Sequence, residues 1–422
     1  MVPYFCFSLW WGVGSCFIAP CHLEAQREIP YRLRVTNHQI MGKLCFFNSV
    51  SSWGGGEKWH HDMSVRLHEM GFPVIVVAGK HSELGIRLRG SGIELEAFHI
   101  TNRSFLNPLK LIQLVRSFRR HGIDTIILNL PSDLKVAGLA ARLAGVRRII
   151  YRRGSAIAVR NTLLNRFIFK YLVDDIIANS QETARTILSH NPHLFDPKKI
   201  HVIYNGIDLQ DFRCLPGDTQ GTAEGLNTRT IPHPAPDLAS GPSGRIGTFV
   251  IGHAGRFARQ KGQHLLLEAA SKLKNRGVGF QLHMAGAGHL EATLRQEVSA
   301  RNLESEVFFT GFSHDIKSFM EGIDVFVLPS LWEGFGYVLV EAMACGKPVV
   351  AFDTSSNPEI IVNDKTGFLV APYNTDALAD RLEQLATNKV LRSSLGSTGR
   401  QRVEQHFSID KTTEALTRLL TA

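Results

Sequence analysis

The sequence predicts an α/β protein with two doubly wound, Rossmann-like domains that face a cleft. Two observations support this class. Short apolar runs rich in β-branched residues alternate with longer amphipathic stretches over residues 44–203, and the same rhythm returns over residues 249–370. Residues 213–247 separate the two series and are rich in Pro, Gly, Ser and Thr. Such alternation favours parallel sheets covered by helices, and the polar break is typical of a linker or insertion.

The expected strands divide between the two domains. In the first domain they are residues 44–47, 74–78, 95–98, 125–128, 148–151, 176–178 and 201–203. In the second domain they are residues 249–251, 280–284, 307–309, 325–328, 349–351 and 368–370. Helices are expected at 57–70, at 108–121, where Pro108 suits a first turn, and at 403–420. Open parallel sheets bind ligands beyond the carboxyl ends of their strands, so the loops that follow strands are the places to search for a site.

Length and composition fit this organisation. The chain has 422 residues, of which 44% are apolar, as expected for a packed protein of more than one domain. We expect an N-terminal extension over 1–40, a first domain over 41–205 and a linker or insertion over 206–247. A second domain over 248–400 and a C-terminal helix over 401–422 complete the chain.

The first residues differ in character from the rest. Residues 1–20 are apolar but lack a basic start and contain prolines and glycines, so a signal peptide or membrane anchor is the less favoured alternative. We expect Met41 to be the working start and residues 1–40 to be poorly ordered. The six cysteines show neither a metal-binding spacing nor a dense disulfide framework, which favours a reducing cytoplasm.

Positive charge is concentrated in one stretch. The net charge is +9, and no acidic residue occurs between Asp133 and Asp174. This local excess favours an anionic partner such as a phosphorylated acceptor or an acidic lipid surface, although a solvated basic face is the alternative. No nucleic-acid motif accompanies it, so no nucleic-acid partner is expected. The basic residues of the stretch are Lys135, Arg142, Arg147, Arg148, Arg152, Arg153, Arg160, Arg166 and Lys170.

The strongest site candidate runs from Glu333 to Glu341. A buried-type strand leads into a glycine loop, and the loop leads into a helix expected to begin near Tyr337. Glycines let the backbone approach a ligand, and the free amides of a helix start suit a diphosphate. We expect the two carboxylates to flank the phosphate site, each accepting hydrogen bonds from a vicinal diol, unless both are surface residues. The residues between them that would bind the donor are Gly334, Phe335, Gly336, Tyr337 and Val338.

A second loop, after the strand at 249–251, combines glycine with basic residues. Arg256 could form a forked contact with two phosphate oxygens, and Lys261 could supply a point charge nearby. Negative charge develops on a diphosphate that departs in a reaction, so fixed cations at that place lower the barrier. The alternative is that both are ordinary surface cations.

Two further glycine turns are weaker candidates. Gly54, Gly55 and Gly56 open the first helix of the first domain and could face the diphosphate or the acceptor, although a tight turn without function is an equal alternative. Gly286 and Gly288 suggest a dinucleotide fingerprint, but the third glycine and the acidic residue are lacking. We expect this loop to line a nucleotide pocket.

Together these segments resemble the retaining glycosyltransferases of the two-Rossmann-domain (GT-B) type, in the large group called glycosyltransferase group 1 or family 4. The resemblance covers about residues 42–420 and includes Asn205-Gly206 before the linker. It implies a nucleotide-sugar donor on the second domain, an acceptor on the first, no metal or other cofactor, and a final helix that returns to the first domain.

The resemblance also assigns roles to single residues. It implies that Glu341 binds the donor ribose, that Glu333 contacts the transferred sugar, and that Arg256 and Lys261 hold the diphosphate. Glu333, Arg256 and Lys261 are thus the expected catalytic residues.

One departure from the family pattern concerns the first domain. Many members carry a histidine in a loop near the transferred sugar, and the corresponding place here holds Arg152 and Arg153. We expect these arginines to face the acceptor. His60 and His61 are the alternative candidates, although a structural role is the favoured interpretation for them.

The sequence therefore predicts a cytoplasmic retaining glycosyltransferase, hexosyltransferase-like, of lipopolysaccharide or polysaccharide assembly. We expect an anionic glycan or lipid-linked acceptor and peripheral contact with the cytoplasmic face of the membrane. The alternatives are a nucleotide-sugar epimerase of the same fold and a catalytically silent nucleotide-sugar-binding subunit.

Overall fold

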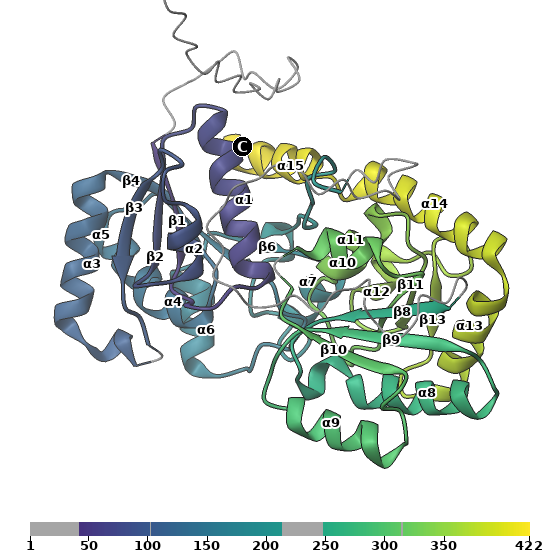
Figure 1. The fold of residues 1–422 in the computed structure, drawn as a ribbon. Helices are drawn as coiled ribbons and strands as arrows, with labels where there is room; N and C mark the ends of the chain where they lie inside the picture. The colour runs from purple at the N-terminus through teal and green to yellow at the C-terminus, as the bar shows by residue number, and fades with distance from the viewer. Residues whose placement is uncertain (1–41, 102, 213–247, 314) are drawn as a thin grey trace, which may run out of the picture. The chain divides into compact units, whose positions relative to one another are not determined.

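The computed structural model describes residues 42–212 except 102, and residues 248–422 except 314. The expectations for residues 1–40 and 213–247 lie outside these ranges. Within them the chain forms two parallel sheets covered by helices, which confirms the predicted fold class (Figure 1). Each expected strand overlaps an observed one.

The first sheet has seven strands in the order β3-β2-β1-β4-β5-β6-β7. The order reverses between β1 and β4, which are neighbours, so the loops after these two strands bound the crevice of the first domain. The strands are β1 (Lys43–Asn48), β2 (Val74–Gly79), β3 (Glu94–Phe98), β4 (Ile123–Leu128), β5 (Arg148–Arg153), β6 (Asp175–Ala178) and β7 (Ile200–Val202).

Helices cover both faces of this sheet. Along β1, Cys45 and Phe47 pack with the cluster under α3, whereas Leu44 and Phe46 pack with the cluster under α1, as the two-residue period of a strand requires. The helix predicted at 108–121 has these bounds, and the Asn107 side chain caps it by accepting from the Lys110 amide. The helices are α1 (Gly55–Glu69), α2 (Glu83–Arg87), α3 (Pro108–His121), α4 (Pro131–Asp133), α5 (Leu139–Ala144), α6 (Leu163–Tyr171) and α7 (Gln181–Leu188).

The second sheet has six strands in the order β10-β9-β8-β11-β12-β13. Its order reverses between β8 and β11, so the loops after these two strands meet at one point. The strands are β8 (Phe249–Ala254), β9 (Phe280–Ala285), β10 (Val307–Gly311), β11 (Val325–Leu328), β12 (Val349–Phe352) and β13 (Phe368–Val370). The helices are α8 (Gln263–Asn275), α9 (Glu291–Ala300), α10 (Ile316–Glu321), α11 (Tyr337–Ala344), α12 (Asn357–Ile360) and α13 (Thr375–Thr387).

The tail differs from the single helix expected over 403–420 and from the boundary placed at 401. It forms α14 (Lys389–His406) and α15 (Ile409–Thr421), and α15 packs on the first domain, against α1 (Figure 1). The break arises because Ile207 pairs with the chain between them: its amide donates to Phe407 O at 3.0 Å and its carbonyl accepts from Ile409 at 2.9 Å. Within the described ranges, no helix has the length and apolarity needed to cross a bilayer.

Candidate functional site

Two cavities lie at the carboxyl ends of the strands, one of about 910 Å³ and one of about 730 Å³. The larger is lined by Glu333 and by first-domain residues that include Arg152. The smaller is lined by Glu341, Gly286 and Trp53. The cavities share part of their walls, so they meet at one junction. The shared lining residues are Gly55, Glu57, Arg256, Gln260, Lys261, Tyr337 and Val338.

The junction is built by the loop between β11 and α11. Helix α11 begins at Tyr337, as predicted, with Gly336 at its N-cap and no side chain bonded to its first amides. Glu333, before the helix, is 6% exposed, and Glu341, inside it, is 7% exposed. The first lines the larger cavity and the second lines the smaller. Glu333 and Glu341 therefore face different cavities on either side of the helix start, while the buried Glu57 of α1 lines both.

The loop after β8 brings the cations to this junction. Lys261 Nζ lies 2.5 Å from Glu333 Oε1 in a largely buried ion pair, whereas the Arg256 side chain is exposed and lines both cavities. Gly262 allows the loop to pack this closely, because it adopts φ +65 and a Cβ there would lie 2.0 Å from the Pro329 carbonyl oxygen. The Leu331 amide also donates to Gln260 O at 2.8 Å.

The environment of Glu341 perturbs its titration. Burial raises the pKa of this carboxyl above its ordinary range, while the ammonium of Lys58, from α1 of the first domain, opposes the rise. Tyr337 adds a second poised group, because its hydroxyl oxygen is buried without a hydrogen-bond partner among the described residues. Both groups face space that a polar ligand could fill.

Arg152 lies in the larger cavity but is held in an unexpected way. Its side chain is only 1% exposed, and its guanidinium donates to Asn129 Oδ1 and to Asn205 Oδ1, each at 3.0 Å. It also stacks over the Trp59 ring, 4.7 Å from the centroid. Neutral amides and an aromatic face satisfy this buried cation, and its Nε has no partner within the described chain. Glu57 is connected to Arg152 through Asn129, because the Glu57 carboxylate accepts from the Asn129 side chain at 3.4 Å.

The other first-domain candidates, Arg153, His60 and His61, differ in burial and in hydrogen-bond partners. Arg153 is buried, lines the larger cavity and donates to the Ile157 carbonyl oxygen. His60 is fully buried, and burial together with the Arg152 charge lowers its pKa to about 3, so it is neutral. His61 contacts Asp62 at 2.9 Å. Neither histidine belongs to the lining of the two cavities.

The predicted glycine turns lie at close approaches of backbone. Gly54 lines the smaller cavity, Gly55 lines both and Gly56 lines the larger. A Cβ at Gly55 would come within 3.0 Å of the Tyr337 ring across the junction. Gly286 lines the smaller cavity, whereas Gly288 packs against the Phe257 backbone and lines neither. Gly334 approaches the first domain so closely that a Cβ on it would lie 1.9 Å from the Gly154 carbonyl oxygen.

Sequence reasoning missed several residues of the site. Asn129 follows the strand at 125–128 directly, and this position after a switch-point strand could have identified it. Asn205 belonged to a recognised motif but had no assigned role. Trp59 and Glu57 gave no signal, because their contacts depend on which face of α1 turns inward.

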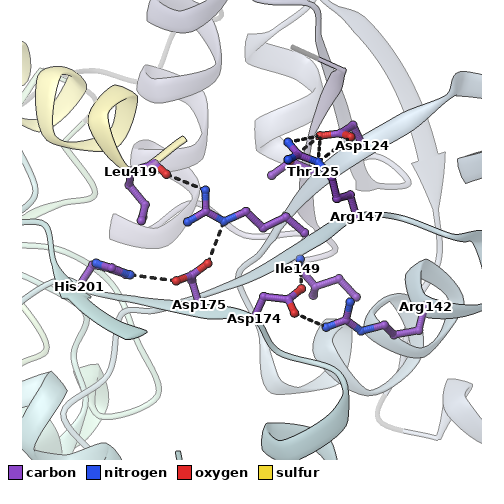
Figure 2. Close-up of polar contacts among 10 residues, drawn as sticks. Asp124, Thr125, Arg142, Arg147, Ile149, Asp174, Asp175, His201 and Leu419 are labelled. Atoms are coloured by element: carbon purple, nitrogen blue, oxygen red, sulfur yellow. Dashed lines mark hydrogen bonds and ion pairs between the residues drawn. The ribbon is translucent and has the colours of Figure 1, made fainter. Parts of the chain in front are cut away.

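The basic stretch is partly neutralised, because three of its nine basic residues form ion pairs. Figure 2 shows acidic residues just outside the stretch that are brought to it by neighbouring strands. Three arginines form ion pairs: Arg142 with Asp174 at 2.6 Å, Arg147 with Asp124 at 3.0 Å and Arg148 with Asp175 at 2.8 Å. Arg148 also donates to the Leu419 carbonyl of α15 at 2.7 Å. These arginines therefore connect elements of the first domain to one another, and Arg148 also connects the sheet to α15.

The fold is that of the two-Rossmann-domain (GT-B) glycosyltransferases. The crystal structure of HepE from Anabaena, in complex with UDP and glucose, superposes with a TM-score of 0.75. The match covers 90% of this chain and 100% of that one, at 22% sequence identity.

Family models identify both domains. The model described as glycosyl transferases group 1 matches residues 244–402, and the model described as glycosyltransferase family 4 matches residues 53–211. The chain therefore belongs to the group 1/family 4 glycosyltransferases.

Curated relatives of this chain are named as bacterial glycosyltransferases. The putative glycosyltransferase EpsF of Bacillus subtilis is 29% identical over 61% of this chain and 65% of its own length. An Escherichia coli protein named UDP-Gal:alpha-D-GlcNAc-diphosphoundecaprenol alpha-1,3-galactosyltransferase is 27% identical over 74% of this chain and 78% of its own length. The chain thus spans just under two thirds of the first relative and a larger part of the second.

Proposed function

We propose that this protein is a retaining glycosyltransferase that moves a sugar from a nucleotide-sugar donor to an anionic, lipid-linked acceptor of the cell envelope, at the cytoplasmic face of the membrane. One observation carries the proposal. Two cavities meet at a helix start and two cations, Arg256 and Lys261, and each cavity contains one buried carboxylate that the other lacks. This arrangement provides a separate place for each part of a nucleotide sugar.

The donor fits the smaller cavity and the junction. Glu341 accepts hydrogen bonds from the ribose diol, which suits a carboxylate with no side-chain hydrogen-bond donor among the described residues. The diphosphate lies at the junction, where the first amides of α11 are unoccupied by a capping side chain and Arg256 is within the wall. The sugar then extends into the larger cavity, beside Glu333. UDP and UDP-glucose complexes of a protein with this fold support a nucleotide-sugar donor.

The cations promote departure of the diphosphate. As the bond between the sugar C1 and the phosphate oxygen breaks, negative charge grows on that oxygen, and Arg256 and Lys261 stabilise it. The acceptor hydroxyl attacks C1 from the same face, and its proton passes to the departing phosphate oxygen. Glu333 holds Lys261 in place through the 2.5 Å ion pair and contacts a hydroxyl of the transferred sugar. Fixed cations supply the charge stabilisation, so we expect turnover to be independent of added divalent metal.

The acceptor fits the larger cavity. Its wall includes Lys135, Arg152, Arg153 and Arg160, and the acid-free composition of this stretch favours an anionic group such as a lipid-linked diphosphate. The name of the Escherichia coli relative, which specifies a diphosphoundecaprenol acceptor, supports the same chemical class.

A thermal-shift screen against UDP, GDP, ADP and their sugars tests the donor site. A ligand at about 100 times its dissociation constant adds about 2.7 kcal/mol of stability, so the preferred nucleotide is recognised by the largest shift. Glu341→Gln should reduce this shift, whereas Glu404→Gln, an exposed carboxylate on α14, should not. An unchanged shift in Glu341→Gln would remove this residue from the ribose role.

The transfer reaction is tested with the preferred nucleotide sugar and a lipid-diphosphate acceptor. Nuclear magnetic resonance of the product should show the anomeric configuration of the donor. An inverted product would contradict the retaining mechanism. Release of nucleotide with an epimerised sugar and no product would instead indicate an epimerase, and binding without turnover would indicate a silent subunit.

A further inference from the structure

Helix α6 of the first domain is apolar on two sides. Its inner side buries Ile168 and Phe169 in the first-domain core. Its outer side presents Leu163, Phe167 and Tyr171, which recur every four residues and so share one face of the helix. A helix that served only to cover a sheet would place polar side chains on that outer face.

The outer face is strongly exposed. Leu163 is 83% exposed, Phe167 49% and Tyr171 54%, and Leu164 beside them is 43% exposed. The rings of Phe167 and Tyr171 lie 5.1 Å apart between centroids, so the group is contiguous. Single exposed apolar residues are ordinary, whereas a contiguous group on one helix marks an interaction surface. We call these four residues the α6 face.

Cations border the α6 face. Arg166 and Lys170 lie one turn apart on α6, and Arg160 lies in the loop before it; all are exposed. Arg166 donates to the neutral Asn161 side chain at 2.8 Å, and the Lys170 ammonium lies over the Tyr171 ring, 5.2 Å from its centroid.

No carboxylate of the same segment neutralises these cations. Residues 134–173 contain no Asp or Glu, and the flanking acids are engaged elsewhere, Asp133 with Ser49 and Asp174 with Arg142. This part of the basic stretch therefore keeps the positive charge that its ion-paired arginines have lost.

The α6 face adjoins the larger cavity. Ile168 and Phe169, on the inner side of the helix, belong to the cavity wall, and so do Asn165 and Arg160. One short helix thus separates the exposed apolar face from the space proposed to hold the acceptor. A molecule bound on the outer side would deliver a polar group to the cavity around the edge of this helix.

We propose that the α6 face and its cations dock this protein on an anionic lipid bilayer. The apolar side chains would enter the boundary between headgroups and acyl chains, and Arg160, Arg166 and Lys170 would lie among lipid phosphates. A bilayer fits better than a second copy of the chain, because a symmetric dimer through this face would bring like charges together. The inference deepens the proposed function, on which it rests only for the identity of the acceptor.

Vesicle flotation with the full chain tests the docking. The vesicles contain phosphatidylcholine alone or mixed with phosphatidylglycerol, and each is used at low and high salt. We expect binding to the anionic vesicles and weakening by salt. Leu163→Asp and Phe167→Asp should each abolish binding, whereas Val390→Asp should not, because Val390 on α14 is a matched aliphatic residue at 81% exposure.

The cations require their own comparison. Replacement of Arg160, Arg166 and Lys170 by Gln should lower the partition coefficient about a hundredfold, since each basic residue near an anionic surface contributes roughly fivefold. Replacement of the exposed Lys198, Lys199 and Lys365 by Gln removes the same charge elsewhere and should leave most of the binding intact. Circular dichroism checks that every variant is folded.

Several outcomes would overturn the docking. The first is that the protein does not bind anionic vesicles. The others are that Leu163→Asp and Val390→Asp lose vesicle binding equally, or that the two triple Gln variants lose it equally. Concentration-dependent dimerisation that Leu163→Asp abolishes, without vesicle binding, would assign the face to a second copy. Transfer to a water-soluble acceptor separates the two proposals, because Leu163→Asp should retain it. Vesicle binding without turnover on any donor would contradict the proposed function but not the docking. Turnover without vesicle binding would contradict the docking but not the proposed function.

Discussion

The two domains satisfy their buried charges in opposite ways. In the second domain Lys261 contacts the Glu333 carboxylate at 2.5 Å, so a cation and an anion neutralise each other at the junction. In the first domain Arg152 is buried against Asn129, Asn205 and the Trp59 ring, which are neutral. A charge held by neutral groups keeps its field, whereas a paired charge is positioned but partly cancelled. Glu57, which accepts from Asn129, offsets part of the Arg152 charge without contacting it directly. The first domain therefore holds a buried cation with no acid in direct contact, and the second fixes the position of its cation through an ion pair.

The largest expected effect tests the second domain. Lys261→Ala and Arg256→Ala should each lower the rate of transfer about 10²- to 10³-fold, because each removes a cation from the place where leaving-group charge develops. Single-turnover kinetics with saturating donor measures the change. Arg259→Ala is the matched control, since this exposed arginine lies in the same loop but lines neither cavity. Comparable losses in all three variants would show that general surface charge, and not the junction, matters.

A smaller effect is expected in the first domain. Arg152→Gln should lower kcat/KM for an anionic acceptor roughly ten- to a hundredfold, equivalent to about 1.4 to 2.7 kcal/mol of lost charge-assisted binding. The donor-induced thermal shift should be unchanged. Arg147→Gln should leave acceptor kinetics at the wild-type level, because this arginine is paired with Asp124 on the surface. If Arg152→Gln altered only stability, the cation would be a structural support and the contrast between the domains would have no functional meaning.

The two regions also differed in how far sequence could predict them. Around Glu333 and Glu341 the residues lie in one continuous strand–loop–helix segment, so local spacing alone indicated their arrangement on either side of a helix start. Arg256 and Lys261 lie in the other loop of the same switch point, which the strand order of a doubly wound sheet brings alongside. Local rules and one topological rule were enough for this half of the site.

The first domain needed contacts between distant segments. The ion pairs of Arg147 and Arg148 depend on the register of β4, β5 and β6, which composition cannot supply. A count of charges along 134–173 therefore overestimated the exposed field. The division of the tail at Ser408 has a similar cause, because the pairing with Ile207 is a long-range event. The basic residues that remain exposed beside α6 became recognisable only when the paired ones were identified.

The smallest effect concerns a buried carboxyl of the first domain. Asp133 is fully buried, and its oxygens accept from Ser49, through the backbone amide at 3.2 Å and the hydroxyl at 2.5 Å, and from the backbone of Leu130. Burial raises its pKa to about 7, far above its ordinary value. Between about pH 4 and pH 7 the folded protein therefore binds a proton that the unfolded chain does not. By linkage, the contribution of Asp133 to stability is greatest below this window and falls as the pH rises through it.

Asp133→Asn should remove the free-energy cost of holding an ionised carboxylate at this buried position above pH 7. At pH 8 the variant should be more stable than the wild type by about 1 to 2 kcal/mol, less than the full linkage value because the amide fits the two Ser49 contacts imperfectly. At pH 5, where the wild-type carboxyl is protonated, the difference should vanish or reverse. Urea unfolding at both pH values measures it. Asp124→Asn is the opposite control. The hydrogen bond from Arg147 lowers the pKa of Asp124, so loss of this carboxylate should make the folded protein less stable at pH 8. If Asp133→Asn were less stable than the wild type at both pH values, the buried carboxylate would stabilise the folded protein even in its ionised form. The first domain would then accommodate this negative charge without a cation.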